Sequence, residues 1–171
     1  MSETFLYFAY GSNMFTSRLT ERAPSAVAIG TAFVEGRRLT FDKRSKDGSG
    51  KCDIEATGSP ADRVWGVLFR IASDEAACLD KAEGLDHGYC KGEVQALTPA
   101  GAKPAVAYFA TDKDPGRLPY HWYKRYVIAG ATEHHLPAIY IAGIRDVPSQ
   151  EDPDAARRSG NEALLSGAPP L

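Results

Sequence analysis

The sequence predicts an α+β fold built on a mixed sheet or barrel, on three observations. Short apolar segments bounded by turn residues come first, segments with helical spacing concentrate later, and the turns between neighbouring strands are short. A chain of 171 residues suits a single domain with a buried core. We therefore expect one domain over residues 1–147, followed by a partly irregular C-terminal extension over residues 148–171.

The expected strands are short runs of apolar and aromatic residues. Residues 5–10 are almost wholly apolar, which favours a central strand covered on both faces. Further strands are predicted over residues 36–41, 64–71, 93–97 and 105–110, with a turn at 98–101 and a charged surface loop at 42–51.

The expected helices follow from spacing and from end signals. Ser73 is a good N-cap and Gly84 a natural stop, so a helix is predicted over residues 73–83 with Glu83 as its last residue. Residues 138–147 fit a helix or a buried strand, and Pro137 favours the helix. Other helices are predicted over residues 15–21 and 120–130, with one short helix inside the extension.

Composition excludes several classes of function. Lys and Arg number 20 against 22 Asp and Glu, so the positive field that attracts nucleic acid or anionic membranes is missing, and a small-molecule partner is favoured. No apolar run approaches the roughly 20 residues of a membrane-spanning helix. Histidines and cysteines lack zinc-site spacing, and neither a P-loop nor a dinucleotide fingerprint occurs, so neither metal nor cofactor is expected.

The three cysteines point to a reducing compartment. They are odd in number and form no C-x-x-C pair, and the N-terminus has no secretory signal pattern, so we expect a cytoplasmic protein. Cys78 is expected to be a buried packing residue in its helix. Cys90, in an expected polar loop after Gly88 and Tyr89, is the better candidate for a reactive thiol.

The first candidate for a binding site is the segment Tyr10, Gly11, Ser12, Asn13 and Met14. A strand that ends in Gly-Ser-Asn can present several backbone N–H groups to one point and so bind a carboxylate. An ordinary strand-ending turn explains the same residues.

Glu83 is the candidate for proton transfer. At the C-terminal end of a helix the dipole disfavours its charged form, and an apolar surrounding would add to that effect. Such a carboxyl group suits general acid and base catalysis. A solvated glutamate beside a glycine cap is the alternative. An aromatic cluster that includes Tyr123 is core by default, although one of its hydroxyl groups could line a pocket.

Several motifs together resemble the γ-glutamylcyclotransferase family, including its AIG2-like members. They are FAYGSNM at 8–14, RAPSA at 22–26, VWGVLF at 64–69, LDKAEG at 79–84, HGY at 87–89 and GATEHHLPAIY at 130–140, in the order of the family. The resemblance implies a small mixed β-barrel flanked by α-helices, and an enzyme that cyclises γ-glutamyl amino acids to 5-oxoproline without a cofactor. Glu83 would be the acid and base, and the loop from Tyr10 to Met14 would hold the substrate.

The resemblance also implies that Tyr89 and Tyr123 line the pocket. Some members carry the first tyrosine one residue later, which corresponds to Cys90, and a further pocket tyrosine of some members falls near Lys113. The leaving-group side of the pocket can therefore differ. The remaining alternatives are a γ-glutamylamine cyclotransferase, an enzyme that removes γ-glutamyl protecting groups, and a non-catalytic γ-glutamyl or carboxylate-binding domain. The oligomeric state, a homodimer included, stays open.

Overall fold

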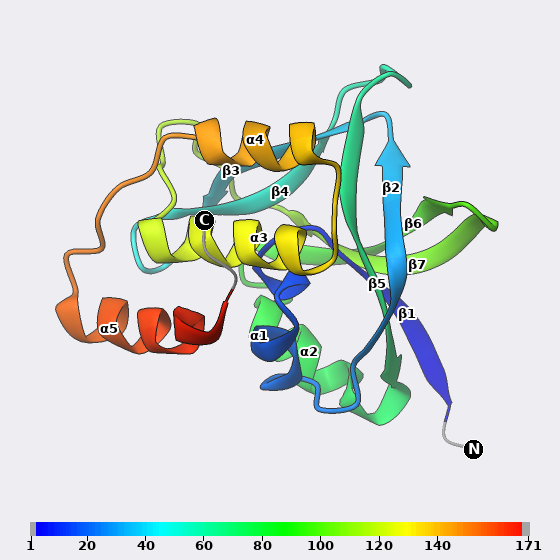
Figure 1. The fold of residues 1–171 in the computed structure, drawn as a ribbon, viewed down its shortest axis with the longest axis horizontal. Coiled ribbons are helices and arrows are strands. Elements are labelled where there is room, and N and C mark those ends of the chain that lie inside the picture. The colour runs from blue at the N-terminus through cyan, green and yellow to red at the C-terminus, as the bar shows by residue number, and fades with distance from the viewer. Residues whose placement is uncertain (1–2, 169–171) are drawn as a thin grey trace.

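A five-stranded closed barrel forms the centre of the computed structural model, which describes residues 3–168 (Figure 1). The strands follow the order β1, β5, β2, β6, β7 around the barrel. Their bounds are Thr4–Ala9 for β1, Val27–Glu35 for β2, Arg63–Ala72 for β5, Tyr89–Thr98 for β6 and Gly101–Ala110 for β7. β1 runs antiparallel to β5 and parallel to β7, so the barrel is mixed. The predicted fold class and the central position of the first strand are confirmed.

A two-stranded hairpin forms a second sheet, separate from the barrel sheet. It consists of β3 (Arg37–Arg44) and β4 (Gly50–Ala56), which pair antiparallel. The predicted surface loop over 42–51 is therefore too long, because β3 continues to Arg44 and β4 begins at Gly50. Neither β2 nor β4 was among the predicted strands.

The helices lie beside the barrel, with α3 (His121–Glu133), α4 (Ala138–Asp146) and α5 (Ala155–Leu164) on the left of Figure 1. The two short helices α1 (Thr16–Thr20) and α2 (Ala76–Glu83) lie below α3 and to the right of α5 in this view. All five were predicted, and of the predicted residues 138–147 all but Val147 are helical. Gly84 caps α2 in the left-handed conformation, with φ 72°, which glycine adopts without strain. None of the described helices has the length and apolar character that crossing a membrane requires.

The cysteines do not lie as expected. Cys78 is exposed, so its prediction as a packing residue is wrong. Consecutive residues of a helix point about 100° apart, and the buried side of α2 is taken by Leu79. Cys90 is exposed on β6 rather than in a loop, and Cys52 on β4 is the buried thiol.

Asp152 attaches the C-terminal segment to the body of the protein. Its carboxylate accepts hydrogen bonds from the indole of Trp122 on α3 (2.8 Å) and from Arg157 on α5 (2.7 and 2.5 Å). The Asp152 side chain is fully buried. Because Arg157 and Trp122 both donate to it, the pKa of this carboxyl group lies well below its usual range.

Replacing Asp152 by asparagine is expected to lower the free energy of unfolding by about 3 kcal/mol at pH 7, because Arg157 loses its counter-charge. Asp154→Asn is the control, since asparagine caps a helix as well as aspartate does. The folded-state pKa of Asp152 is depressed, so its stabilisation is complete above about pH 4 and is lost below it. Urea unfolding should therefore show the wild type and D152N converging as the pH falls from 7 towards 3. Equal stability at pH 7 would contradict this role.

Candidate active site

The chain turns sharply after β1 and leaves backbone N–H groups unpaired within the described residues. Residues Ser12–Met14 form a 3-10 turn that starts after Gly11. The N–H of Met14 donates to the carbonyl of Gly11 (3.0 Å), whereas the N–H groups of Gly11, Ser12 and Asn13 donate to no acceptor among residues 3–168. These three N–H groups are thus available to an anion. Met14 does not belong with them, because its N–H is used within the turn and its side chain is fully buried.

Helix α3 holds this turn in place through Gly130. A Cβ atom at Gly130 would lie 2.3 Å from the backbone nitrogen of Phe15 and 2.4 Å from the carbonyl carbon of Met14. Only glycine lets the helix approach the turn so closely. The position of the donors of Gly11, Ser12 and Asn13 therefore depends on a residue more than a hundred positions away in the sequence.

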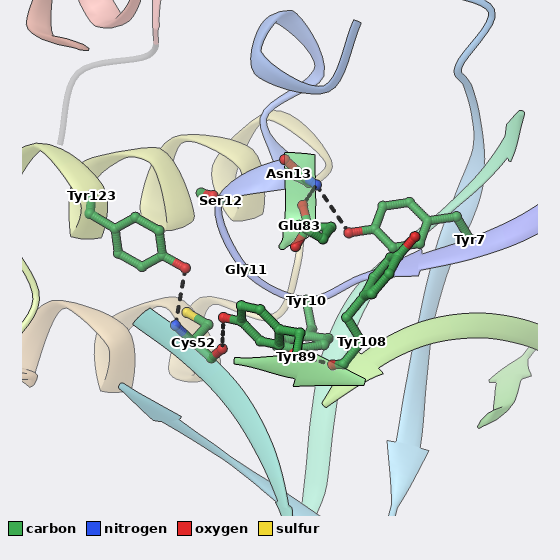
Figure 2. A pocket seen from close by; sticks show the side chains of 10 residues that line it. All are labelled: Tyr7, Tyr10, Gly11, Ser12, Asn13, Cys52, Glu83, Tyr89, Tyr108 and Tyr123. Atoms are coloured by element: carbon green, nitrogen blue, oxygen red, sulfur yellow. Dashed lines mark hydrogen bonds between the residues drawn. The ribbon is translucent and has the colours of Figure 1, made fainter. Parts of the chain in front are cut away.

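A pocket rich in tyrosines opens beside the turn, and we call it the tyrosine pocket (Figure 2). It brings together residues from β1, β4, β6, β7, α2, α3 and the turn itself. They are Tyr7, Tyr10, Gly11, Ser12, Asn13, Cys52, Glu83, Tyr89, Tyr108 and Tyr123. Every predicted site residue except Met14 is among them.

Glu83 ends α2 with its carboxylate against Asn13. Its Oε1 accepts from Asn13 Nδ2 (2.5 Å) and from Arg22 Nη1 (3.1 Å), and Arg22 also donates to Asn13 Oδ1 (2.7 Å). No described residue donates to Oε2. The Glu83 side chain is only 16% exposed, which argues against a freely solvated surface glutamate. Arg22 supplies a counter-charge to the Glu83 carboxylate.

The tyrosine hydroxyl groups have different hydrogen-bond states. Tyr10 donates to the Tyr108 carbonyl, and Tyr89 donates to the Cys52 carbonyl (2.6 Å). Tyr7 accepts from Asn13 (3.1 Å) and donates its own proton to no described residue. Tyr123 accepts from the Cys52 N–H (3.0 Å), and its own proton faces the Cys52 thiol, a weak acceptor. Burial raises the pKa of both groups well above the usual value, so both remain O–H donors.

The alternative between Tyr89 and Cys90 is answered by strand geometry. Neighbouring residues of β6 point to opposite faces, so Tyr89 lies in the pocket and the Cys90 side chain is exposed. Lys113 does not line the tyrosine pocket and instead pairs with Asp53 (2.9 Å).

Sequence reasoning missed Tyr7, Tyr108, Cys52 and Arg22. The two tyrosines lie in predicted strands, where a buried aromatic residue is core by default, although a buried hydroxyl group needs a polar partner. The need of a buried tyrosine hydroxyl for a polar partner was the one signal that could have placed Tyr7 and Tyr108 at the site. Within residues 3–168 no group of three or more His, Cys, Asp or Glu side chains is arranged to hold a metal ion.

This barrel, with one carboxylate in a pocket of tyrosines, has relatives among known proteins. The model of the AIG2-like family matches residues 63–144. Gamma-glutamylcyclotransferase of Bos taurus is 35% identical over 143 residues, which cover 81% of this chain and 76% of the relative. The enzyme of that name from Mus musculus is 32% identical over 157 residues, which cover 87% and 81%.

A solved structure named gamma-glutamyl cyclotransferase has the same fold. It superposes with a TM-score of 0.86 at 29% identity, covering 96% of this chain and all of the other. The chain belongs to the γ-glutamylcyclotransferase family.

Proposed function

We propose that the protein is a γ-glutamylcyclotransferase, which converts a γ-glutamyl amino acid into 5-oxoproline and the free amino acid. One observation carries the proposal. The tyrosine pocket contains a single carboxylate, Glu83, whose Oε2 is available beside the free N–H groups of Gly11, Ser12 and Asn13. The relatives that bear this name support it.

The substrate binds through its two charged ends. The α-carboxylate of the glutamyl group accepts hydrogen bonds from the free N–H groups of the turn. The α-ammonium lies against Glu83, which removes a proton and leaves a nucleophilic amine. The nucleophile and the γ-carbonyl belong to the same molecule, so the pocket accelerates the reaction largely by holding the chain in a folded conformation.

The reaction balances without a co-reactant. The bond between the α-nitrogen and the γ-carbon forms, and the bond from that carbon to the leaving nitrogen breaks. The α-nitrogen loses two protons and the leaving nitrogen gains two, and Glu83 can carry each of them. The O–H groups of Tyr7 and Tyr123 are the available donors to the oxyanion that forms on the γ-carbonyl oxygen.

Incubation with γ-glutamyl-alanine tests the proposal. We expect 5-oxoproline and alanine in equal amounts, measured by chromatography, without added metal or cofactor. Saturable binding of γ-glutamyl-alanine with no product would instead identify a non-catalytic binding domain.

The expected cellular location, oligomeric state and domain boundary stay predictions. A cytoplasmic location is supported by the three free thiols. A homodimer would be detected as a doubled mass in light scattering. A catalytic domain that ends at residue 147 is equally a prediction.

A further inference from the structure

A second pocket adjoins the tyrosine pocket, and we call it the cationic pocket. The two share Ser12, Glu83, Tyr89 and Tyr123 as common walls. Its charged lining residues are Arg18, Arg22, Lys43, Lys51 and Glu83. Four cations therefore surround one carboxylate, which itself belongs to the proposed proton-transfer site.

Two of these cations are already paired. Arg22 pairs with Glu83 (3.1 Å), and Lys51 pairs with Asp47 (2.8 Å). The Lys51 ammonium also lies over the rings of Trp122 and Tyr123, at 4.5 Å from each centroid. These contacts compensate the two charges without a ligand.

The other two cations have no carboxylate partner among residues 3–168. Arg18 donates to the hydroxyl of Ser12 (3.1 Å) and stacks on the ring of Tyr126 (4.4 Å). Lys43 lies over the ring of Tyr89 (4.6 Å) and makes no ion pair with a described residue. Lys43 is only 8% exposed, and burial lowers the pKa values of Lys43 and Arg18. A buried cation without a counter-charge is costly, so this pocket suits an anionic ligand.

The cationic pocket lies where the leaving group of a bound substrate can extend. When the glutamyl group occupies the tyrosine pocket with its α-amine at Glu83, the rest of the substrate can extend past the shared wall at Glu83 and Tyr89. A neutral leaving amino acid brings one carboxylate into the cationic pocket. Glutamate or aspartate brings two, which matches the two unpaired cations, and a diamine brings none.

We propose that the preferred leaving group is an acidic amino acid, so that γ-glutamyl-glutamate and γ-glutamyl-aspartate are better substrates than γ-glutamyl derivatives of neutral amino acids or amines. This inference rests on the proposed function. Lys43 and Arg18 are then residues that determine specificity, because each can donate a charge-assisted hydrogen bond to a leaving-group carboxylate.

Three substrates test the preference, namely γ-glutamyl-glutamate, γ-glutamyl-alanine and γ-glutamylputrescine. We expect kcat/KM to be about tenfold higher for the glutamate compound than for the alanine compound, the effect of one further charge-assisted hydrogen bond. The putrescine compound, whose leaving amine adds a positive charge, should react most slowly. Added salt should reduce kcat/KM most steeply for the glutamate compound.

Variants of Lys43 connect the preference to the pocket. In Lys43→Met the ratio of kcat/KM for the glutamate and alanine compounds should fall about tenfold, and Lys43→Arg should restore most of it. Lys46→Met is the matched control, because it removes an exposed lysine from the turn that follows β3 and should keep the wild-type ratio. Circular dichroism of each variant verifies that it is folded.

The outcomes separate the two proposals. A ratio near one in the wild type, or a ratio that Lys43→Met leaves unchanged, would refute the acidic preference while the cyclotransferase activity stands. Absence of 5-oxoproline from all three compounds would refute the proposed function and this inference with it.

Discussion

Replacing Glu83 by glutamine is expected to lower kcat on γ-glutamyl-alanine about a thousandfold, within the range that general acid and base catalysis contributes. Glutamine keeps the shape of the side chain, and its oxygen can still accept from Asn13 and Arg22. It cannot take a proton from the substrate ammonium. Initial rates of 5-oxoproline formation measure the loss, and KM should change much less than kcat, because proton transfer belongs to the transition state.

The control for this experiment is Glu162→Gln. Glu162 is an exposed glutamate near the C-terminal end of α5, so the control makes the same chemical change outside the tyrosine pocket. Its kcat should stay at the wild-type value. Full activity of E83Q would exclude Glu83 as the proton carrier.

Replacing Gly130 by alanine is expected to cost about 3 kcal/mol of stability and to reduce activity at the same time. The added methyl group would overlap the backbone of Phe15 and Met14, which cannot rotate away as the end of a side chain can. Relief requires α3 or the turn at Ser12–Met14 to move, and that turn carries the proposed carboxylate donors. Thermal unfolding should show a melting temperature lower by about 10 °C.

Gly143→Ala makes the same change in α4 as a control. No atom lies within 4 Å of a Cβ at Gly143, and the site is exposed. Alanine there should stabilise the protein by about 0.5–1 kcal/mol, since it is the better helix former. Wild-type stability and activity in G130A would contradict the close packing of α3 on the turn.

Much of the site follows from local signals in the sequence. Gly84 marks the end of α2 and so positions Glu83, and the end of β1 at Ala9 positions the turn that follows. Each signal involves neighbouring residues, which is why the sequence shows it. The sequence did not predict that the Met14 N–H is unavailable to a ligand. This N–H is used because the turn forms a hydrogen bond from Met14 to the carbonyl of Gly11.

The missed elements depend on contacts between distant residues. β4 carries Lys51, Asp53 and Glu55, charged residues that are typical of a surface loop. In the fold Asp53 is buried, accepts from the Ala110 N–H (2.8 Å) and pairs with Lys113 (2.9 Å). A sequence does not show which charges will meet, so the strand that supplies Cys52 and Lys51 to the two pockets was not predicted.

β2 was missed for a different reason. Its first half exposes Val27 and Ile29, and its pairing with β5 shifts register between Ala28 and Gly30. A bulge interrupts the alternation of buried and exposed residues from which a strand is predicted. Only the later part of β2 keeps that alternation, with Ala32 and Val34 buried.

The central claim is that the α-amine of the substrate attacks the γ-carbonyl of the same molecule. The most direct test is to run the reaction in water enriched in heavy oxygen and to analyse the acyl product. The account predicts that mass spectrometry of a γ-glutamyl-alanine reaction will find 5-oxoproline without the heavy isotope, because no water enters the reaction. Glutamate carrying one heavy oxygen atom would show hydrolysis instead and would contradict intramolecular cyclisation.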